Sequence, residues 1–119
     1  MADSLAKLTK DLRAFARARD WEQYHTPKNL AMALSVEASE LVEIFQWLTP
    51  AQAGKLSAEK REHLAQEISD VLMYLLRLAD FYRVDPLKAA RAKMKLNAAK
   101  YPVGGPKLIE RGRKRAGRA

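Results

Sequence analysis

Apolar residues recur at steps of three and four along most of the chain, which is the spacing of an amphipathic helix. The pattern predicts four main helices, over residues 4–19, 27–48, 57–82 and 86–100. The sequence has none of the alternating apolar and polar runs that are typical of strands. We therefore expect an all-α domain, most simply a four-helix bundle.

The predicted helix borders carry recognisable start and stop signals. Thr26-Pro27 and Asp85-Pro86 each place a capping residue before a proline, which suits the first helical position. Ser57 is a candidate cap for the third helix. Thr49-Pro50 is expected to end the second helix, because a residue before proline is pushed out of the α region. Residues 50–57 are expected to form a loop.

Net charge changes this picture only near the C-terminal end. The 119 residues carry a net charge of +8, of which residues 107–119 contribute +5 and residues 1–106 only +3. We therefore expect one all-α domain over 1–106, followed by a basic, flexible tail over 107–119. Such a tail favours at most non-specific contact with nucleic acid.

Composition excludes several classes of protein. The chain has no cysteine, so it cannot form disulfides or thiolate zinc sites. Its apolar runs are far shorter than the roughly 20 residues of a membrane span. Its first residues also lack the apolar core of a secretory signal. We therefore expect a cytoplasmic protein with no membrane partner.

Two pairs of carboxylates lie on faces that should pack. Glu37 falls on the apolar stripe of the second helix and Glu40 follows three residues later. Glu67 and Asp70 repeat this arrangement on the third helix. Residues three apart on a helix share a face. An ionised carboxylate in an apolar seam is costly unless it is paired or holds a metal.

Three interpretations of these carboxylates compete. They are rim residues paired with Lys or Arg, ligands of a hard cation, or part of a di-iron site. Di-iron bundles need two Glu-x-x-His motifs, and the chain has only two histidines, of which only His25 follows a glutamate at that spacing. A site of carboxylates alone favours Mg²⁺, with Mn²⁺ as the alternative, and phosphate chemistry.

Two further sets of residues fit a nucleotide. One side of the fourth helix carries groups suited to a polyphosphate: Lys93, Asn97, Lys100 and Tyr101. Groups suited to stacking on a base and hydrogen-bonding with it flank the second helix: Trp21, His25, Asn29 and Trp47. A solvated basic face and ordinary core aromatics are the simpler alternatives.

These blocks together resemble a known family. Residues 19–47 (RDWEQYHTPKNLAMALSVEASELVEIFQW), 67–80 (EISDVLMYLLRLAD) and 93–102 (KMKLNAAKYP) follow one another in the order seen in the MazG-like all-α nucleoside triphosphate pyrophosphohydrolases. The first block is most similar to the dCTP pyrophosphatase branch. The resemblance covers about residues 5–102.

The resemblance implies cleavage of a nucleoside triphosphate, dCTP or a modified dCTP, to the monophosphate and pyrophosphate. It implies Mg²⁺ ligation by Glu37, Glu40, Glu67 and Asp70, with Glu37 or Glu40 also activating the attacking water. The phosphate and base sets above keep their roles. It also implies a homodimer, or a dimer of dimers, with sites built between subunits. One departure is that Leu12 and Phe15 stand on the first helix where some relatives use a polar contact to the base.

Two other functions compete with this one. A small basic helical nucleic-acid-binding protein would explain the tail, but it leaves the seam carboxylates unexplained. A bundle without catalytic activity, serving as a partner module, would show no metal-dependent change in melting temperature.

Overall fold

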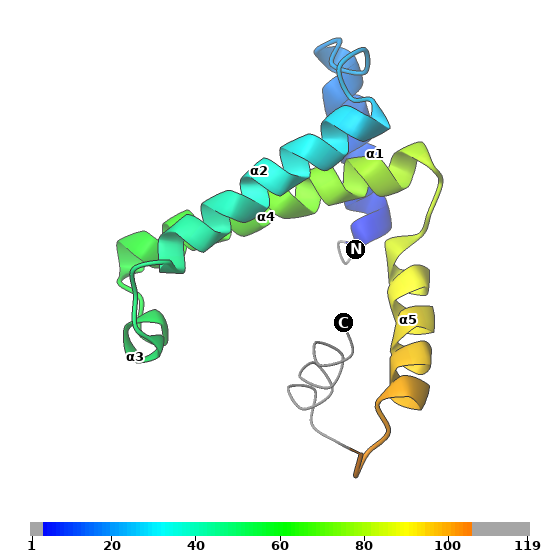
Figure 1. The fold of residues 1–119 in the computed structure, drawn as a ribbon. Coiled ribbons are helices and arrows are strands. Elements are labelled where there is room, and N and C mark those ends of the chain that lie inside the picture. Colours follow the sequence, from blue (N-terminus) through cyan, green and yellow to red (C-terminus); the bar gives the residue numbers. More distant parts are fainter. Residues whose placement is uncertain (1–3, 106–119) are drawn as a thin grey trace. The chain divides into compact units, whose positions relative to one another are not determined.

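The computed structural model describes residues 4–105 as five α-helices (Figure 1). They are α1 (Leu5–Ala18), α2 (Pro27–Phe45), α3 (Pro50–Ala53), α4 (Ala58–Phe81) and α5 (Pro86–Lys100). No strand occurs in this range, so the all-α class is confirmed. The expected tail, 107–119, lies outside the described residues. None of the helices in the described part is both long and apolar enough to cross a membrane.

The helices begin where their capping residues predict. The Thr26 side chain accepts a hydrogen bond from the backbone N–H of Asn29 at the start of α2. The Ser57 side chain accepts one from Lys60 at the start of α4, and Ser4 caps α1 in the same way. Each of these bonds satisfies a backbone donor that the first turn of a helix leaves without a partner.

The segment after α2 differs from the expectation. The second helix ends at Phe45, before the predicted residue 48, and the predicted loop 50–57 begins with the short helix α3. Thr49 caps this helix in a capping box, in which Thr49 and Gln52 each bond the other's backbone N–H. A helix of four residues is too short to show an apolar period, which is why the pattern missed it.

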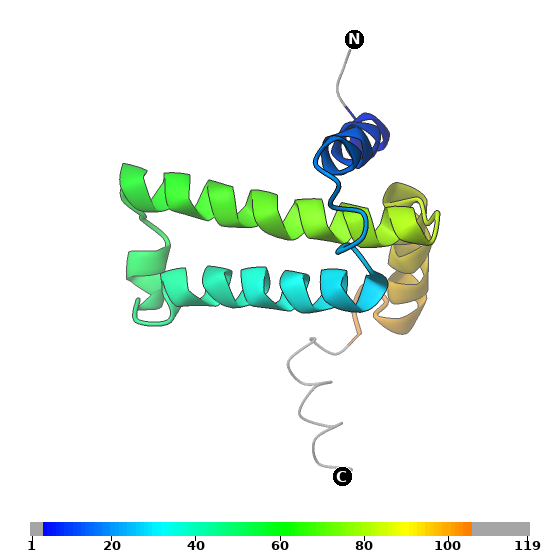
Figure 2. The same ribbon diagram turned by 90° about the horizontal axis from the view of Figure 1, so that it is seen from above.

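The long helices α2 and α4 form the framework of the molecule. They lie side by side and run in opposite directions, and α1 crosses the C-terminal half of α4 (Figures 1 and 2). The fully packed core is small: the only apolar residues buried among those described are Ala16, Leu30 and Leu76. One of these residues comes from each of α1, α2 and α4, and α4 is the helix against which both of the others pack.

The chain divides into two compact units between Asp85 and Pro86. The first unit holds α1 to α4, and the second holds α5. Within the second unit the side chains of α5 are exposed from Leu87 to Lys100, and Tyr101 is half-buried.

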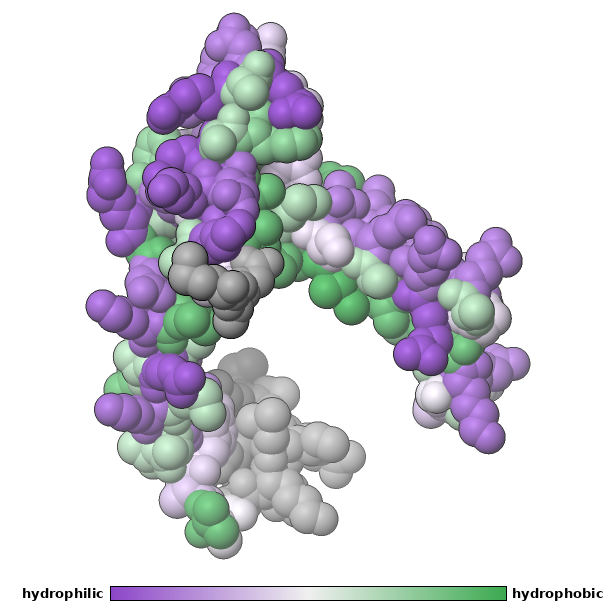
Figure 3. All heavy atoms as spheres, turned by 180° about the vertical axis from the view of Figure 1, so that it is seen from behind, coloured by the Kyte–Doolittle hydropathy of each residue, from purple (hydrophilic) through white to green (hydrophobic). Residues whose placement is uncertain are grey.

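Large apolar side chains remain exposed on the framework helices. Figure 3 shows apolar surface along the α2–α4 pair. The exposed residues include Met32 and Val36 on α2 and Ile68 and Leu75 on α4. Apolar surface of this extent on a small domain is typical of an interaction face.

Replacing Ser57 with Ala is expected to lower the free energy of unfolding by about 1 kcal/mol, because α4 loses its N-cap. The measurement is urea unfolding followed by circular dichroism. Ser35→Ala is the matched control, since Ser35 is exposed inside α2, where alanine has the higher helix propensity. An equal loss in both variants would contradict the capping role.

Candidate active site

Four carboxyl groups meet between α2 and α4. Oxygen atoms of Glu37, Glu67 and Asp70 all lie within 4.8 Å of one another. Hydrogen bonds link Glu40 to both Glu67 and Glu37. The two pairs that the spacing placed on separate helices are thus brought together because α2 and α4 pack along those faces.

Burial and the contacts between carboxyl groups raise the pKa of two members of this cluster, Glu37 and Glu67. Partial burial, followed by the hydrogen bond to Glu40, raises the pKa of Glu37 to about 7. The hydrogen bond to Glu40 also raises the pKa of Glu67, which is 8% exposed. Glu40 accepts both bonds, which lower the pKa of its own carboxyl group. The ionised form of Glu40 is therefore stabilised, whereas the ionised forms of Glu37 and Glu67 are disfavoured.

These four residues fit a hard divalent cation. The Oε2 atoms of Glu37 and Glu67 are buried and have no hydrogen-bond partner. Within residues 4–105, no Lys or Arg forms an ion pair with any member of the cluster. Buried, ionised carboxylate oxygens are costly unless a proton or a cation pairs with them, and oxygen ligands from several carboxylates suit Mg²⁺ or Mn²⁺.

One histidine beside the cluster was missed from the sequence. His63 Nε2 lies 3.3 Å from Glu67 Oε1, one turn earlier on α4. The i,i+4 spacing of the two residues was a usable signal. Because His63 holds Oε1, the unpartnered Oε2 is the atom that Glu67 offers to a cation.

An aromatic pocket of about 300 Å³ adjoins the carboxylates. Phe15, Trp21, His25 and Tyr74 line it, and so does Asp70 of the cluster. The volume is at the lower end of the range for ligand sites, which suits a small planar group. Asp70 therefore belongs both to the acidic cluster and to the pocket.

The turn after α1 places Trp21 and His25 in this pocket. Asp20 adopts a left-handed conformation with φ of 59°. The N–H groups of Asp20 and Trp21 bond the carbonyls of Arg17 and Ala16, which is a Schellman motif. The N–H of His25 then bonds the carbonyl of Trp21, so the chain turns tightly again before α2 begins.

The rings of the pocket form a continuous series. Ring centroids are 5.6 Å apart for Phe15 and Trp21, 6.1 Å for Trp21 and His25, and 6.5 Å for His25 and Tyr74. Phe15 and Tyr74 were not among the predicted base-binding residues. Tyr74 lies one turn beyond Asp70, and that spacing could have indicated it.

Two predicted base-binding residues lie away from the pocket within one chain. The Asn29 side chain donates to the carbonyl of Tyr24 at 3.0 Å and is exposed. Trp47 is 86% exposed just beyond the C-terminal end of α2. The 19 residues of α2 span about 28 Å, so the pocket and Trp47 lie near opposite ends of that helix.

The predicted phosphate-binding residues belong to the second compact unit. Lys93, Asn97 and Lys100 are exposed on α5, and Lys100 Nζ lies 5.5 Å from the centre of the Tyr101 ring. Their role toward a nucleotide remains a prediction.

Comparison with known proteins places the chain in a family. The model of the MazG-like family matches residues 32–113. The chain belongs to the MazG-like family. Both Glu-x-x-[Glu/Asp] pairs fall inside the matched region.

Named relatives of this MazG-like chain are similar over most of its length. It is 48% identical to human dCTP pyrophosphatase 1 and 46% identical to the rat protein of that name, each over 91 residues, or 75% of the chain. The matched region is 54% of those proteins, so the chain spans about half the length of the curated relatives it matches. The crystal structure of a pyrophosphatase from Archaeoglobus fulgidus is 38% identical, with a TM-score of 0.68 over 86% of this chain and 95% of that one.

Glu37→Gln is expected to raise the melting temperature of the metal-free protein at pH 8. The pKa of Glu37 rises on folding from 4.5 to about 7. Protonation of Glu37 therefore stabilises the folded state. This contribution to the free energy of unfolding is fully present below pH 4.5 and is lost as the pH rises through about 7. Glutamine removes the charge and keeps the shape, so the melting temperature should also fall less over this range.

The measurement is thermal unfolding in EDTA from pH 4.5 to 8. Glu43→Gln is the matched control, because Glu43 is exposed on the same helix. A lower melting temperature of Glu37→Gln at pH 8 would show that Glu37 is not held in a repulsive cluster.

Proposed function

We propose that this protein is a Mg²⁺-dependent nucleoside triphosphate pyrophosphohydrolase. Its proposed substrate is dCTP or a modified dCTP, cleaved to the monophosphate and pyrophosphate as part of nucleotide-pool clean-up. The observation that carries the proposal is Asp70, which joins the carboxylate cluster to the aromatic pocket. Metal-held phosphates and a base would thus have adjoining places. The names of the human and rat relatives support the choice of dCTP.

The cation-binding role falls to Glu37, Glu40, Glu67 and Asp70. A bound divalent cation would supply charge neutralisation at the phosphates, and the all-carboxylate ligand set suits a hard cation such as Mg²⁺. The protein holds the ligands rigidly, because both pairs project from long helices that pack against each other. His63 orients Glu67 from outside through their contact at 3.3 Å.

The proton-accepting role falls to Glu37 or Glu40. Both carboxyl groups lie on one face of α2, and they already share a hydrogen bond. The pair can orient the attacking water toward the α-phosphorus and take up its proton.

The remaining contacts are assigned by residue type. Trp21 stacks on the base and His25 hydrogen-bonds with it in the aromatic pocket. The polyphosphate is held by residues of α5 and the turn after it, namely Lys93, Asn97, Lys100 and Tyr101. Asn29 supports the turn before α2 through its bond to Tyr24.

We also propose that the working form is a homodimer or a homotetramer. Met32, Val36, Ile68 and Leu75 leave apolar surface exposed on α2 and α4, which a second copy could cover. Trp47 lies too far along α2 to reach the pocket of its own chain. In the assembly it would complete the base site of a neighbouring copy.

Glu40→Gln and Asp70→Asn are each expected to lower kcat/KM for dCTP by at least about a hundredfold, because each removes a charged cation ligand. The measurement is pyrophosphate release from a panel of dNTPs and modified dNTPs with Mg²⁺ or Mn²⁺. Helical circular dichroism should be unchanged, and Glu43→Gln should match wild type. Absence of turnover by the wild-type protein on every nucleotide would refute the proposed function.

Two inactive variants are expected to restore each other if sites are shared between copies. Trp47→Ala and Asp70→Asn are co-expressed with different tags, and the doubly tagged assembly is purified. In a symmetric dimer one of the two sites of each mixed pair is intact, so the purified mixed dimer should show about half of wild-type activity, and an unpurified mixture of freely paired chains about a quarter. No activity above that of the separate variants, or a solution mass equal to the 13.5 kDa monomer, would contradict the shared site.

A further inference from the structure

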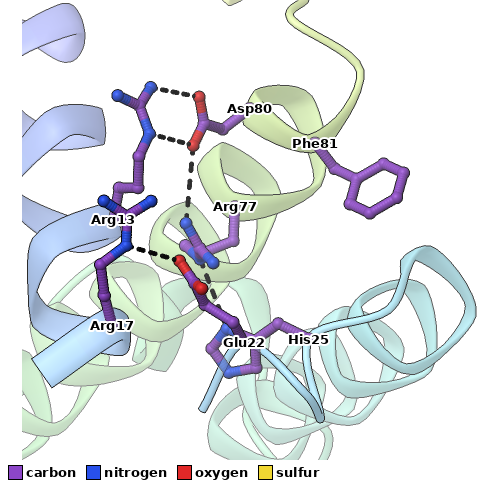
Figure 4. A pocket seen from close by; sticks show the side chains of 7 residues that line it. All are labelled: Arg13, Arg17, Glu22, His25, Arg77, Asp80 and Phe81. Carbon is purple, nitrogen blue, oxygen red and sulfur yellow. Dashed lines mark hydrogen bonds and ion pairs between the residues drawn. The ribbon is translucent and has the colours of Figure 1, made fainter. Parts of the chain in front are cut away.

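A series of polar contacts links α1, α4 and His25 beside the aromatic pocket. Arg13 of α1 donates to both oxygens of Asp80 on α4, at 2.9 and 2.6 Å. Arg77 of α4 lies 3.5 Å from Asp80 and donates through Nε to His25 Nδ1 at 3.3 Å. Figure 4 shows these side chains around a second cavity of about 240 Å³. The series thus ends on a residue of the proposed base site.

The contact from Arg77 decides which nitrogen of His25 carries a proton. Arginine has only donors on its guanidinium group. His25 Nδ1 must therefore be the accepting nitrogen, and Nε2 carries the hydrogen of the neutral ring. Burial, followed by the charge of Arg77, lowers the pKa of His25, which keeps the ring neutral near pH 7.

Arg77 is itself held in place from both sides. Its side chain is only 12% exposed, and it lines both the aromatic pocket and the second cavity. The bidentate Arg13–Asp80 pair fixes the carboxylate that Arg77 faces. A largely buried guanidinium between an anchored carboxylate and an imidazole has little freedom to turn away.

We propose that Arg77 is a positioning residue that fixes His25 as a hydrogen-bond donor in the base pocket and so favours cytosine over uracil and thymine. This inference rests on the proposed function. All three bases accept at O2, but N3 is an acceptor in cytosine and carries a hydrogen in uracil and thymine. When it faces N3, a ring locked with its hydrogen on Nε2 bonds the acceptor of cytosine and opposes the N3–H of uracil or thymine, which is the kind of contact that discriminates strongly. An unlocked ring can exchange tautomers and accept either base.

The test compares three full-length variants with wild type. Arg77→Leu removes the donor, Arg77→Lys keeps a group that only donates, and Arg61→Leu is the control, since Arg61 is exposed on the same helix. The first readout is the imidazole ¹⁵N spectrum at pH 7.5 without nucleotide, assigned with His63→Gln because the chain has two histidines. The second is kcat and KM for dCTP and dUTP with Mg²⁺.

Wild type, Arg77→Lys and Arg61→Leu should show His25 protonated on Nε2, whereas Arg77→Leu should show mixed tautomers. Arg77→Leu should also lower the dCTP-to-dUTP ratio of kcat/KM by about tenfold, which corresponds to about 1.4 kcal/mol. The change should lie mainly in KM, because the carboxylate cluster is untouched. Asp80→Asn, which loosens Arg77 without emptying the pocket, should shift both readouts in the same direction.

Three results would overturn the inference. They are a wild-type His25 protonated on Nδ1, an Arg77→Leu variant that keeps the wild-type tautomer, or an unchanged ratio in both Arg77→Leu and Asp80→Asn. The tautomer is measured without substrate, so these failures are distinct from that of the proposed function. If wild type hydrolyses no nucleotide, the proposed function fails and the claim about base selectivity fails with it.

Discussion

Repulsion among the four carboxyl groups between α2 and α4 is the constraint around which the rest of the first unit is arranged. The Oε2 atoms of Glu37 and Glu67 are buried without a partner, and the pKa values of these two carboxyl groups are raised. Only rigid neighbouring elements can hold such groups together. The long antiparallel pair provides that rigidity, since its two helices pack along their length (Figure 2).

One face of α4 organises the proposed chemistry. Glu67, Asp70, Tyr74 and Arg77 follow one another at steps of three, four and three, so they form a single stripe about 15 Å long. The stripe passes from the cation ligands, through the wall of the base pocket, to the residue that orients His25. The helical periodicity of α4 thus sets the order of the proposed phosphate and base sites along this helix.

The part of this site that follows local rules could be predicted from the sequence. Glu37 and Glu67 interrupt apolar stripes, and Thr26 and Ser57 mark helix starts, because each signal lies within a few residues. The Arg77–His25 and Arg13–Asp80 contacts could not be predicted, since their partners lie 52 and 67 residues apart. A charged residue on a helix is usually solvated, so Arg77 gave no sign of its burial. Trp47 shows the same limit. The sequence places an aromatic side chain near the end of the second helix but does not give its distance from the pocket.

The acidic cluster also bears on the proposed assembly. Glu37 and Glu67 occupy seam positions where leucines would have extended the core, and the residues fully buried in apolar contact are correspondingly few. A small domain buries a smaller fraction of its surface than a large one, so lost apolar burial weighs more heavily on its stability. Ile68 and Leu75 flank the acidic seam on α4 and remain exposed. Covering them with a second copy would recover apolar burial that the carboxylates remove. The need for a cation site and the need for a partner would then share one physical origin.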